Sequence, residues 1–553
     1  MKVLELRDTW LKMDDLDENM KLQLKKATMN ELDDLFYQNV PFGTGGMRGI
    51  IGPGTNRINV ATIGRATAGF GVYLKERYQG EINVVIGYDN RHYSKEFAYH
   101  AAEILINLGI TASVFKKLTA TPIVSYTIRE LKAQAGIMIT ASHNPPEYNG
   151  FKIYDETGCQ LLPQEAQKVV DQIERTKLSQ SKNKLGKEPI DLGDEFEIAY
   201  LNDLSPLVSQ NERIKNLSIG FSPQHGTALE PVKKMFEKYG YANCTYVSEQ
   251  STVDGDFSGT KSANPEDVQA FDLLKKYGER YQLELLVTTD PDADRVGVAY
   301  RNRVGKYVNM TGNQVGALLT DYYVKKKELT PQSYLIKTIV TSDLGAEIAR
   351  KNGVEIVNVL TGFKYIGNAI NQKGSDNFLL GYEESYGYLV EPITRDKDGI
   401  QIVLAIAEIA NVAKEHDKNL GDVLEKIYHE NGYYLEDLIS IQLPGKSGYQ
   451  QIQQIYESYK RVNWNEIAYG EDFEELVRID YKTGLKEPFN FEQAQVFKLT
   501  FKDGNWLCIR PSGTEPKLKI YFGVKKESYQ EATKAMQWLR SKIEKLHKEL
   551  IGK

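Results

Sequence analysis

The chain has few cysteines, no long apolar run and no surplus of positive charge. Its three cysteines, Cys159, Cys244 and Cys508, are too few and too scattered for a disulfide framework or a CxxC metal knuckle. No uninterrupted apolar segment reaches the roughly 18 residues that a membrane-spanning helix needs. The beginning of the chain carries acidic residues and lacks the apolar core of a signal peptide, so we expect a cytoplasmic protein without a membrane partner.

The charge balance argues against a nucleic-acid partner. The sequence holds 69 basic and 75 acidic residues, which gives a net charge of −6, whereas nucleic-acid binders usually carry a basic excess. Hydrophobic residues make up 41% and charged residues 26% of the chain, which is typical of a globular protein. With 553 residues, the chain is long enough for about three or four domains.

Short apolar runs alternate with helical patterns over most of the chain. Such runs, separated by helices of about 10–15 residues, indicate βαβ units and a mostly parallel sheet. One or two amphipathic helices are expected in residues 1–35, and a helix is expected to begin at Asn264-Pro265, a good cap followed by proline. The strands that we predict in the first three units are 82–88, 135–140, 284–289 and one that starts at Tyr334.

The pattern divides into three α/β units and a smaller C-terminal α+β unit. Polar stretches at Arg175–Glu188 and Pro444–Gly448 are interpreted as linkers. In the last helix, Met536, Leu539, Ile543 and Leu546 are spaced to form one buried face. The predicted domain boundaries are 1–205, 206–325, 326–445 and 446–553.

A serine loop follows the predicted strand 135–140. It reads Thr-Ala-Ser-His-Asn-Pro, with Ser142 beside His143 and Lys152 ten residues after Ser142. A serine next to a base and a cation can accept a phosphoryl or acyl group, although the GxSxG elbow of a hydrolase is missing. Ligands bind at the carboxyl ends of strands in such folds, which favours a functional loop. The alternative is a turn capped by Ser142 and Asn144.

An acidic loop, Asp-Pro-Asp-Ala-Asp-Arg, follows the strand 284–289. Asp290, Asp292 and Asp294 alternate along it and can converge on one divalent cation. An EF-hand would need glycine and glutamate where Arg295 and Arg301 stand, which excludes a calcium sensor, and Mg²⁺ fits better. The alternative is an acidic turn in solvent.

Three further loops offer groups for an anionic sugar. Residues 510–516 (RPSGTEP) combine an arginine, hydroxyls and a glycine turn that suit a phosphate, or form a plain turn before a strand. Residues 381–387 (GYEESYG), together with 395–399 (RDKDG), can grip sugar hydroxyls, but this signal is weak alone. Residues 43–49 (GTGGMRG) do not fit a dinucleotide fingerprint, yet they offer Arg48 to an anion.

These motifs, in this order, resemble the α-D-phosphohexomutase superfamily. Within it, the chain is most similar to the longer bacterial α-phosphoglucomutases, which share the GTGGMRG and GYEESYG loops. The resemblance runs from Thr44 to Thr514 and therefore covers nearly the whole chain. It implies an α/β fold of three topologically similar α/β domains around a central cleft, followed by a C-terminal α+β domain.

The resemblance also assigns roles to individual residues. It implies that Ser142 carries a phosphoryl group, and that this phosphate and Asp290, Asp292 and Asp294 bind Mg²⁺. Arg48, His143, Lys152 and Lys397 match positions suggested to move protons. The positions that match substrate-binding residues are Thr44, Arg295, Thr361, Gly362, Glu383, Ser385, Arg510, Ser512, Gly513 and Thr514.

The activity implied by the resemblance is an intramolecular phosphotransfer, an isomerase reaction. A hexose 1-phosphate and a hexose 6-phosphate would interconvert through glucose 1,6-bisphosphate, which also serves as primer, in a monomer or homodimer. Pro291, where many members have glycine, and the continuation PEYNG after the serine loop resemble the branch with pentose-phosphate mutases and leave phosphopentomutase activity as an alternative. Phosphomannomutase activity is a further alternative within the superfamily. A magnesium-dependent sugar phosphatase or a non-catalytic sugar-phosphate sensor would be a different class of protein.

Overall fold

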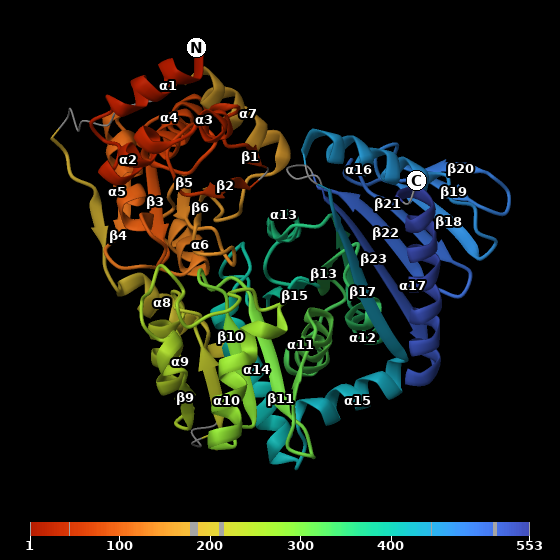
Figure 1. Ribbon diagram of the computed structural model, residues 1–553. Helices are drawn as coiled ribbons and strands as arrows, with labels where there is room; N and C mark the ends of the chain where they lie inside the picture. Colours follow the sequence, from red (N-terminus) through yellow and green to blue (C-terminus); the bar gives the residue numbers. More distant parts are fainter. Residues whose placement is uncertain are drawn as a thin grey trace. The chain divides into compact units, whose positions relative to one another are not determined.

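The structure is a computed structural model that describes residues 2–43, 45–176, 186–209, 215–443, 445–512 and 517–551. The chain forms two compact units. The first comprises Met1–Leu319 and Gly362–Gly421, and the second comprises Thr320–Thr361 and Asp422–Lys553. Their elements are labelled in Figure 1.

Three short helices begin the first unit, where the sequence predicted one or two. Asp17 and Thr28 each cap a new helix with a side-chain oxygen, and Thr28 forms a capping box with Glu31. These two caps divide the segment, and the helices bury Trp10 and Leu24 in a shared apolar cluster. The helices are α1 (Lys2–Leu11), α2 (Glu18–Lys26) and α3 (Met29–Phe36).

A seven-stranded mixed sheet follows, in the order β1-β2-β6-β5-β3-β4-β7. Strands β5, β3, β4 and β7 are parallel, whereas β6 and β2 run antiparallel to their neighbours. The predicted strands 82–88 and 135–140 correspond to β3 and β5, both almost wholly buried, as expected for strands covered on two faces. The strands are β1 (Phe42–Gly43), β2 (Gly46–Ile50), β3 (Asn83–Tyr88), β4 (Thr111–Phe115), β5 (Ala135–Ile139), β6 (Tyr148–Asp155) and β7 (Ile190–Leu192). The helices of this region are α4 (Val60–Arg77), α5 (Ser94–Asn107), α6 (Thr121–Glu130) and α7 (Pro163–Arg175).

The second sheet has five strands in the order β12-β11-β10-β8-β9. The helix predicted to begin at Asn264-Pro265 is absent there, and that prediction is wrong. Asn264 caps only a turn, Asp267 starts a short 3₁₀ helix by accepting from Gln269 N, and the α-helix begins at Asp272. The elements are α8 (Glu195–Asp203), β8 (Ile219–Ser222), α9 (Leu229–Lys238), β9 (Cys244–Tyr246), α10 (Asp272–Tyr281), β10 (Leu285–Thr289), β11 (Val296–Arg301) and β12 (Tyr307–Asn309).

The next segment contributes to both units. In the second unit β13 (Tyr334–Thr338) and β14 (Glu355–Val359) pair in parallel, with α12 (Asp343–Lys351) between them. In the first unit β15 and β16 form an antiparallel hairpin, and α14 is buried along nearly its whole length. The remaining elements are α11 (Gly312–Lys326), α13 (Phe363–Lys373), β15 (Phe378–Glu383), β16 (Gly387–Leu389), α14 (Gly399–Glu415) and α15 (Leu420–Asn431).

The end of the second unit is a seven-stranded antiparallel sheet in the order β17-β23-β22-β21-β18-β19-β20. Helix α17 runs along this sheet (Figure 1). It buries Leu539 and Ile543, as predicted, with Met536 and Leu546 half-buried. The elements are β17 (Tyr433–Gln442), α16 (Gly445–Lys460), β18 (Ile467–Asp472), β19 (Val477–Asp480), β20 (Lys486–Pro488), β21 (Phe497–Phe501), β22 (Trp506–Pro511), β23 (Lys517–Lys526) and α17 (Tyr529–Ile551).

The two linker predictions have different outcomes. Most of the polar stretch after Arg175 lies outside the described residues. The second linker is wrong, because α16 begins at Gly445. Glycine and serine suit the first turn of a helix, whose N–H groups have no partner within the helix, so they do not by themselves indicate a linker.

Three antiparallel hairpins of the first unit carry the serine loop, the acidic loop and the turn of the GYEESYG segment. Loops 140–147, 290–295 and 384–386 join β5 to β6, β10 to β11 and β15 to β16, each pair antiparallel. The sequence indicated mostly parallel sheets, whereas these three pairs are antiparallel, as are β1–β2, β2–β6 and β11–β12. The loops are too short for a crossover helix, so the chain reverses and pairs with the strand that it has just left.

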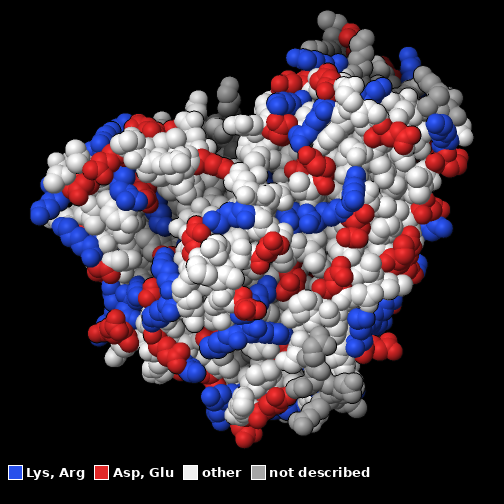
Figure 2. All heavy atoms as spheres, turned by 180° about the vertical axis from the view of Figure 1, so that it is seen from behind, with Lys and Arg blue, Asp and Glu red and all other residues white. Residues whose placement is uncertain are grey.

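The charge on the surface and the apolar character of the helices agree with the composition of the sequence. Acidic and basic side chains are interspersed over the face drawn in Figure 2, in keeping with a net charge close to balance. Within the described part of the chain, no helix combines the length and the apolar character that crossing a bilayer requires.

Candidate active site

Ser142 lies in a strained loop at the carboxyl end of β5. Its backbone has φ 53°, in the left-handed region that non-glycine residues rarely adopt, and its N–H donates to Thr140 Oγ1 at 2.8 Å. The side chain is almost wholly buried. Ser142 Oγ donates to Asp290 Oδ2 at 2.7 Å and lies 3.3 Å from His143 Nδ1. The hydroxyl group therefore faces both a carboxylate and an imidazole.

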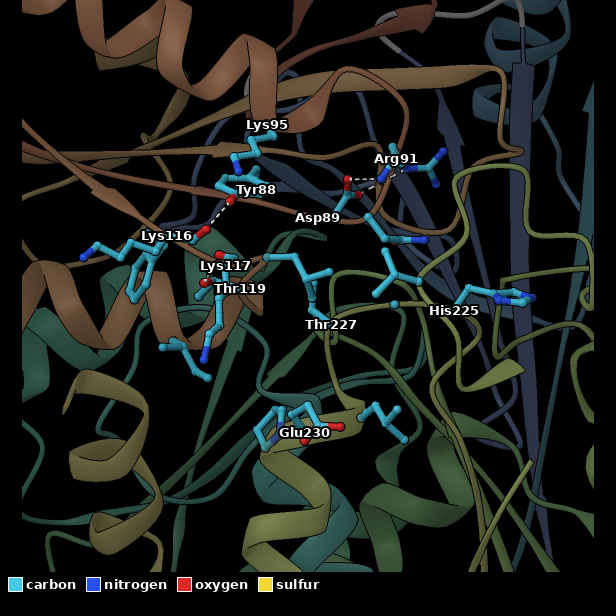
Figure 3. Close-up of a pocket in the computed structure, with 18 of the residues that line it drawn as sticks. Tyr88, Asp89, Arg91, Lys95, Lys116, Lys117, Thr119, His225, Thr227 and Glu230 are labelled. Carbon is cyan, nitrogen blue, oxygen red and sulfur yellow. Dashed lines mark hydrogen bonds and ion pairs between the residues drawn. The ribbon is translucent and has the colours of Figure 1, made fainter. Parts of the chain in front are cut away.

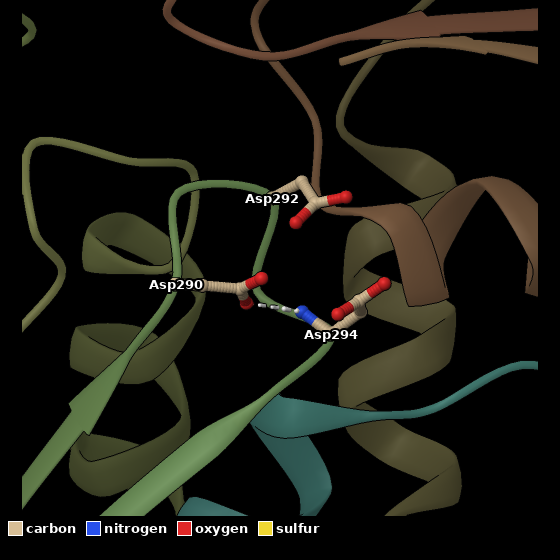
Figure 4. Close-up of side chains that lie close together, drawn as sticks. All are labelled: Asp290, Asp292 and Asp294. Carbon is tan, nitrogen blue, oxygen red and sulfur yellow. Dashed lines mark hydrogen bonds between the residues drawn. The ribbon is translucent and has the colours of Figure 1, made fainter. Parts of the chain in front are cut away.

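The three aspartates of the acidic loop converge, as Figure 4 shows. One carboxylate oxygen from each of Asp290, Asp292 and Asp294 lies within 4.8 Å of the others, and all three residues are buried. The loop curls back through Ala293, which has φ 60°. This curl lets Asp290 Oδ1 accept from the backbone N–H groups of Asp294 and Arg295 at 3.0 and 2.9 Å.

The acidic loop fits a hard divalent cation. Among the described residues, Asp292 Oδ1 and Asp294 Oδ1 are buried without a hydrogen-bond partner. Burial, reinforced by Asp292 and Asp294, raises the pKa of Asp290 well above its ordinary value. Oxygen atoms of carboxylates are the ligands that Mg²⁺ prefers, and a cation would relieve both the repulsion and the missing partners. The residues present therefore suit magnesium.

Two buried lysines neutralise part of this acidic loop. Lys152 Nζ, on β6, lies 2.7 Å from Asp292 Oδ2 and 3.0 Å from Asp294 Oδ2. Lys397 Nζ lies 3.1 Å from Asp294 Oδ2 and 3.2 Å from Asp396 Oδ1. Burial opposes their charge, but the carboxylates outweigh it and raise the pKa of both lysines. For Asp294, burial opposes ionisation, yet Lys152 and Lys397 lower its pKa.

Gly387 leaves the space that Lys397 occupies. A Cβ atom at Gly387 would come within 2.3 Å of Lys397 Cδ, so any larger residue at position 387 would displace the lysine. Asp396 fixes the other side of the ammonium group, and it also accepts from Tyr154 OH at 3.1 Å and Gln160 Nε2 at 2.7 Å.

The other predicted basic groups surround the serine loop. Arg48, whose side chain is exposed, donates to Asn144 Oδ1 at 2.6 Å. Burial, together with Arg295 and Arg48, holds the pKa of His143 well below its ordinary value, so its imidazole is neutral near pH 7. Arg295 pairs with Glu266.

The predicted sugar-binding residues lie at the β15–β16 hairpin and the start of α13. Glu383 is buried and its Oε1 accepts from Gly362 N at 2.8 Å. Burial raises the pKa of Glu383, although Lys397 and this hydrogen bond oppose the rise. Ser385 is half-buried in the turn between β15 and β16. Thr361 belongs to the second unit.

The phosphate loop is described only in part. Arg510, at the end of β22, is half-buried, and Ser512 N donates to Lys517 O at 2.8 Å, which closes the hairpin with β23. Both residues belong to the second unit. Thr44, Gly513 and Thr514 lie outside the described residues. The predicted site residues that the structure brings together are Arg48, Ser142, His143, Lys152, Asp290, Asp292, Asp294, Arg295, Gly362, Glu383 and Lys397.

Several residues at the site were missed by sequence reasoning. Thr121, at the beginning of α6, donates its Oγ1 to Asp292 Oδ2 and its N–H to Asp292 O, both at 2.9 Å. Thr227 donates its N–H and Oγ1 to Pro291 O at 2.7 and 3.0 Å. Directly after β3, Arg91 donates to Ser142 O in the serine loop, and Asp89 forms an ion pair with Arg91. Asp89 and Arg91 could have been found from the sequence, because an acidic residue and an arginine follow a predicted strand there.

A cavity of about 1090 Å³ is lined by residues next to the serine loop and the acidic loop. Figure 3 shows Asp89 and Arg91 on one side of it, with Thr227 and His225 from the second sheet's loops on another. Arg91, which binds the serine loop, and Thr227, which binds the acidic loop, therefore line one cavity.

This arrangement defines a class of protein. A buried hydroxyl group hydrogen-bonded to a carboxylate cluster that suits a divalent cation, with cations beside it, is equipped for phosphoryl transfer. The α/β sheets place these groups at their strand ends, where such folds bind ligands.

Comparison with known proteins identifies the family. The chain matches the four domain models described as phosphoglucomutase/phosphomannomutase, the α/β/α domains I, II and III and the C-terminal domain, over residues 39–180, 199–305, 311–430 and 438–537. The chain therefore belongs to the phosphoglucomutase/phosphomannomutase family and is an isomerase-type phosphotransferase. The predicted fold class, three similar α/β domains and a C-terminal domain, is confirmed.

Individual relatives are similar over almost the whole chain. A protein named phosphoglucomutase from Staphylococcus haemolyticus is 34% identical over 96% of this chain and 98% of its own length. A phosphoglucomutase from Staphylococcus aureus is 35% identical over 89% of this chain and 90% of its own. The open form of parafusin, a phosphoglucomutase from Paramecium, has the same fold, with a TM-score of 0.70 at 18% identity over 93% of this chain and 96% of its own.

Proposed function

We propose that the protein interconverts α-D-glucose 1-phosphate and glucose 6-phosphate, with Ser142 as phosphoryl carrier and glucose 1,6-bisphosphate as intermediate and primer. The observation that carries this proposal is the 2.7 Å hydrogen bond from Ser142 Oγ to Asp290, which sets a nucleophilic hydroxyl against three converging carboxylates. The relatives named phosphoglucomutase, aligned over nearly the whole chain, favour glucose over other sugars.

Asp290, Asp292 and Asp294 would hold Mg²⁺, with the phosphate on Ser142 as a further ligand. Bound there, the cation supplies neutralisation of the charge on the transferring phosphoryl group. The two unpartnered oxygens of Asp292 and Asp294 support this role. Thr121 and Thr227 keep the acidic loop in place from two sides, through Asp292 and Pro291.

The basic groups have two roles: the lysines neutralise negative charge on phosphate, and one group accepts a proton. Lys152 and Lys397 have raised pKa values, so at neutral pH they carry charge and neutralise phosphate oxygens. His143 has a lowered pKa, and its Nδ1 faces Ser142 Oγ. Of the four predicted bases, His143 is therefore the one suited to accept a proton from the attacking sugar hydroxyl. Arg48 orients the loop through Asn144.

The reaction balances without another reactant. The 6-hydroxyl of glucose 1-phosphate attacks phosphorus; its O–P bond forms, the Ser142 Oγ–P bond breaks, and the hydroxyl proton passes to His143. The bisphosphate then turns in the site, and Ser142 Oγ takes back the phosphoryl group from the 1-position. The bond between O1 and phosphorus breaks, and His143 returns its proton to O1. Glucose 6-phosphate leaves, and the enzyme is phosphorylated again.

The sugar and its second phosphate need their own contacts. Glu383, buried beside Gly362, suits sugar hydroxyls, and Ser385 and Thr361 would assist it. Arg510 and Ser512, with Thr44, Gly513 and Thr514, would hold the phosphate that is not being transferred. A simple phosphatase does not require a second phosphate site, and this argues for a mutase.

A substrate comparison tests the proposal. Purified protein with Mg²⁺ is given glucose, mannose, ribose or deoxyribose 1-phosphate, each with a trace of the matching bisphosphate. Fast conversion of the glucose compound, with the others far slower, supports the proposal. A preference for a pentose or mannose phosphate would reject glucose 1-phosphate as the main substrate but keep the mutase reaction. Release of free phosphate without formation of the isomer would reject a mutase.

The carrier serine has a matched control. Ser142→Ala should keep the fold and lose nearly all turnover, because no hydroxyl remains to take the phosphoryl group. Ser248→Ala, at an exposed position in the second sheet's domain, should retain parental turnover. Substantial mutase activity in Ser142→Ala would reject Ser142 as the carrier.

A further inference from the structure

Arg91 holds the serine loop through its backbone. Its Nη1 donates to Pro145 O and Tyr148 O at 2.8 and 2.9 Å, and its Nη2 donates to Ser142 O and Asn144 O, both at 2.6 Å. One guanidinium group thus binds four carbonyl oxygens of the segment that carries Ser142. We propose that Arg91 is a positioning residue, which keeps Ser142 in the conformation that phosphoryl transfer requires; this rests on the proposed function.

The serine loop needs such a support. Ser142 has φ 53°, which costs free energy for a residue with a Cβ atom. Left unsupported, the loop would relax toward a more favourable backbone conformation, and Oγ would move away from Asp290. The hydrogen bond to Ser142 O acts on the strained residue itself, and the bonds to Asn144 O and Pro145 O fix the turn that follows.

Arg91 is itself clamped from both sides. Its side chain is buried, and its Nε lies 3.2 Å from the buried carboxylate of Asp89. Asp89 is held in turn by Ser94 Oγ at 2.7 Å and by the N–H of Arg91 at 3.0 Å. Figure 3 shows this pair at the edge of the cavity. The arginine therefore acts on Ser142 from behind, without reaching its hydroxyl group.

A loop from the second sheet's domain completes the clamp. The centre of the Phe257 ring lies 4.9 Å from Arg91 Cζ, and this ring also stacks against His225. Asn90 Nδ2 also donates to Asp254 O at 3.0 Å in the same loop. The first two domains thus meet at the support of the serine loop, so Arg91 links the position of Ser142 to the domain that carries the acidic loop.

Lysine cannot replace this arginine. The guanidinium group is planar and presents five donors in a fixed fork, whereas an ammonium group is a single point with three donors. Arg91→Lys keeps the charge beside Asp89 but cannot reach the four carbonyl oxygens at once. The variant therefore separates the positioning of the loop from the charge of the site.

The test compares Arg91→Lys with Arg65→Lys. Arg65 also donates to backbone carbonyl oxygens, those of Ile173, Glu174 and Thr176, but at the end of α7, away from Ser142. For folded Arg91→Lys we expect kcat to fall about 10²-fold, with KM for glucose 1-phosphate within about threefold of the parent, because the reacting oxygen is misplaced while the sugar contacts remain. Phosphorylation of Ser142 by glucose 1,6-bisphosphate should slow by a similar factor. Arg65→Lys should match the parent.

The experiment distinguishes a failure of the proposed mutase function from a failure of the proposed role of Arg91. A parent protein without mutase activity would reject the function, whereas an active parent with kcat of Arg91→Lys within about threefold would overturn the role of Arg91. An equal loss in Arg65→Lys would overturn it too. Should Arg91→Lys fail to fold, Asp89→Asn decides: it leaves the four carbonyl contacts possible but removes the clamp on Nε. A fall in its kcat at unchanged KM supports the inference, and parental kcat rejects it.

Discussion

Ser142 Oγ donates a 2.7 Å hydrogen bond to Asp290 Oδ2. This bond joins the loop after β5 to the loop after β10, which lie in different sheets. Each loop closes an antiparallel hairpin, so two rigid strand pairs hold the nucleophile and the acidic loop against each other. The same bond connects the two motifs that the sequence marked most clearly.

Magnesium should stabilise the protein through the acidic loop. The parent's melting temperature should rise when Mg²⁺ is added, because a cation that binds only the folded state stabilises it. Asp292→Asn removes the negative charge from a carboxylate whose Oδ1 has no partner among the described residues. We expect this variant to lose most of the rise, as measured by thermal unfolding with and without the metal.

The control for that measurement is Asp191→Asn, an exposed acid near Lys116. It should respond to Mg²⁺ as the parent does. An equal rise in Asp292→Asn and the parent would show that the metal binds elsewhere.

Gly387→Ala should impair catalysis by displacing Lys397. The added methyl group would meet Lys397 Cδ at 2.3 Å, which forces the ammonium group away from Asp294. A displacement of about 1 Å at a reacting site can cost roughly 10²-fold in rate, so we expect kcat to fall by about that factor in steady-state assays.

Gly52→Ala is the matched substitution. Its added methyl group would make only ordinary contacts, the nearest at 3.6 Å to Arg57 Cγ. Parental kcat is expected there, and a comparable loss in both variants would contradict the explanation through Lys397.

Asp398 should make stability depend on pH. Burial raises its pKa to about 6, although Tyr200 and Gln401 donate hydrogen bonds to it. Between its unfolded pKa near 3.8 and about 6, the folded protein holds a proton that the unfolded chain has lost. Stability is therefore lost as the pH rises through this window, by up to about 3 kcal/mol at roughly 1.4 kcal/mol per pKa unit.

Asp398→Asn removes this ionisation. Its free energy of unfolding, relative to the parent, should rise by as much as about 3 kcal/mol between pH 4 and pH 7, whatever the constant cost of the amide. Denaturant unfolding across this range measures the difference, with the exposed Asp376→Asn as control. A difference that does not vary with pH would contradict the raised pKa.

The site residues that could be predicted from the sequence are those that lie together in one continuous motif. Ser142 and the three aspartates each follow a buried apolar strand, so their motif and their position at a strand end were visible together. The strands themselves, such as β3 and β5, were predicted because strands covered on both faces are apolar throughout. The role of Lys397 came only from the resemblance to the family.

What the sequence could not show depends on contacts between distant segments. Arg91 and Thr121 bind backbone atoms of other loops, and backbone acceptors leave no pattern in the residues. The antiparallel strands after each loop were missed because an apolar run does not state its direction. The helix expected at Asn264-Pro265 failed because a good cap starts a turn as readily as a helix.

The most direct test of the central claim locates the phosphoryl group. The protein is incubated with glucose 1,6-bisphosphate and Mg²⁺, digested, and the peptides are examined by mass spectrometry; a portion is first chased with an excess of glucose 1-phosphate. We expect one phosphoryl group, on Ser142, that passes to the sugar during the chase. A phosphoryl group on another residue, or turnover without any phosphorylated enzyme, would contradict the claim.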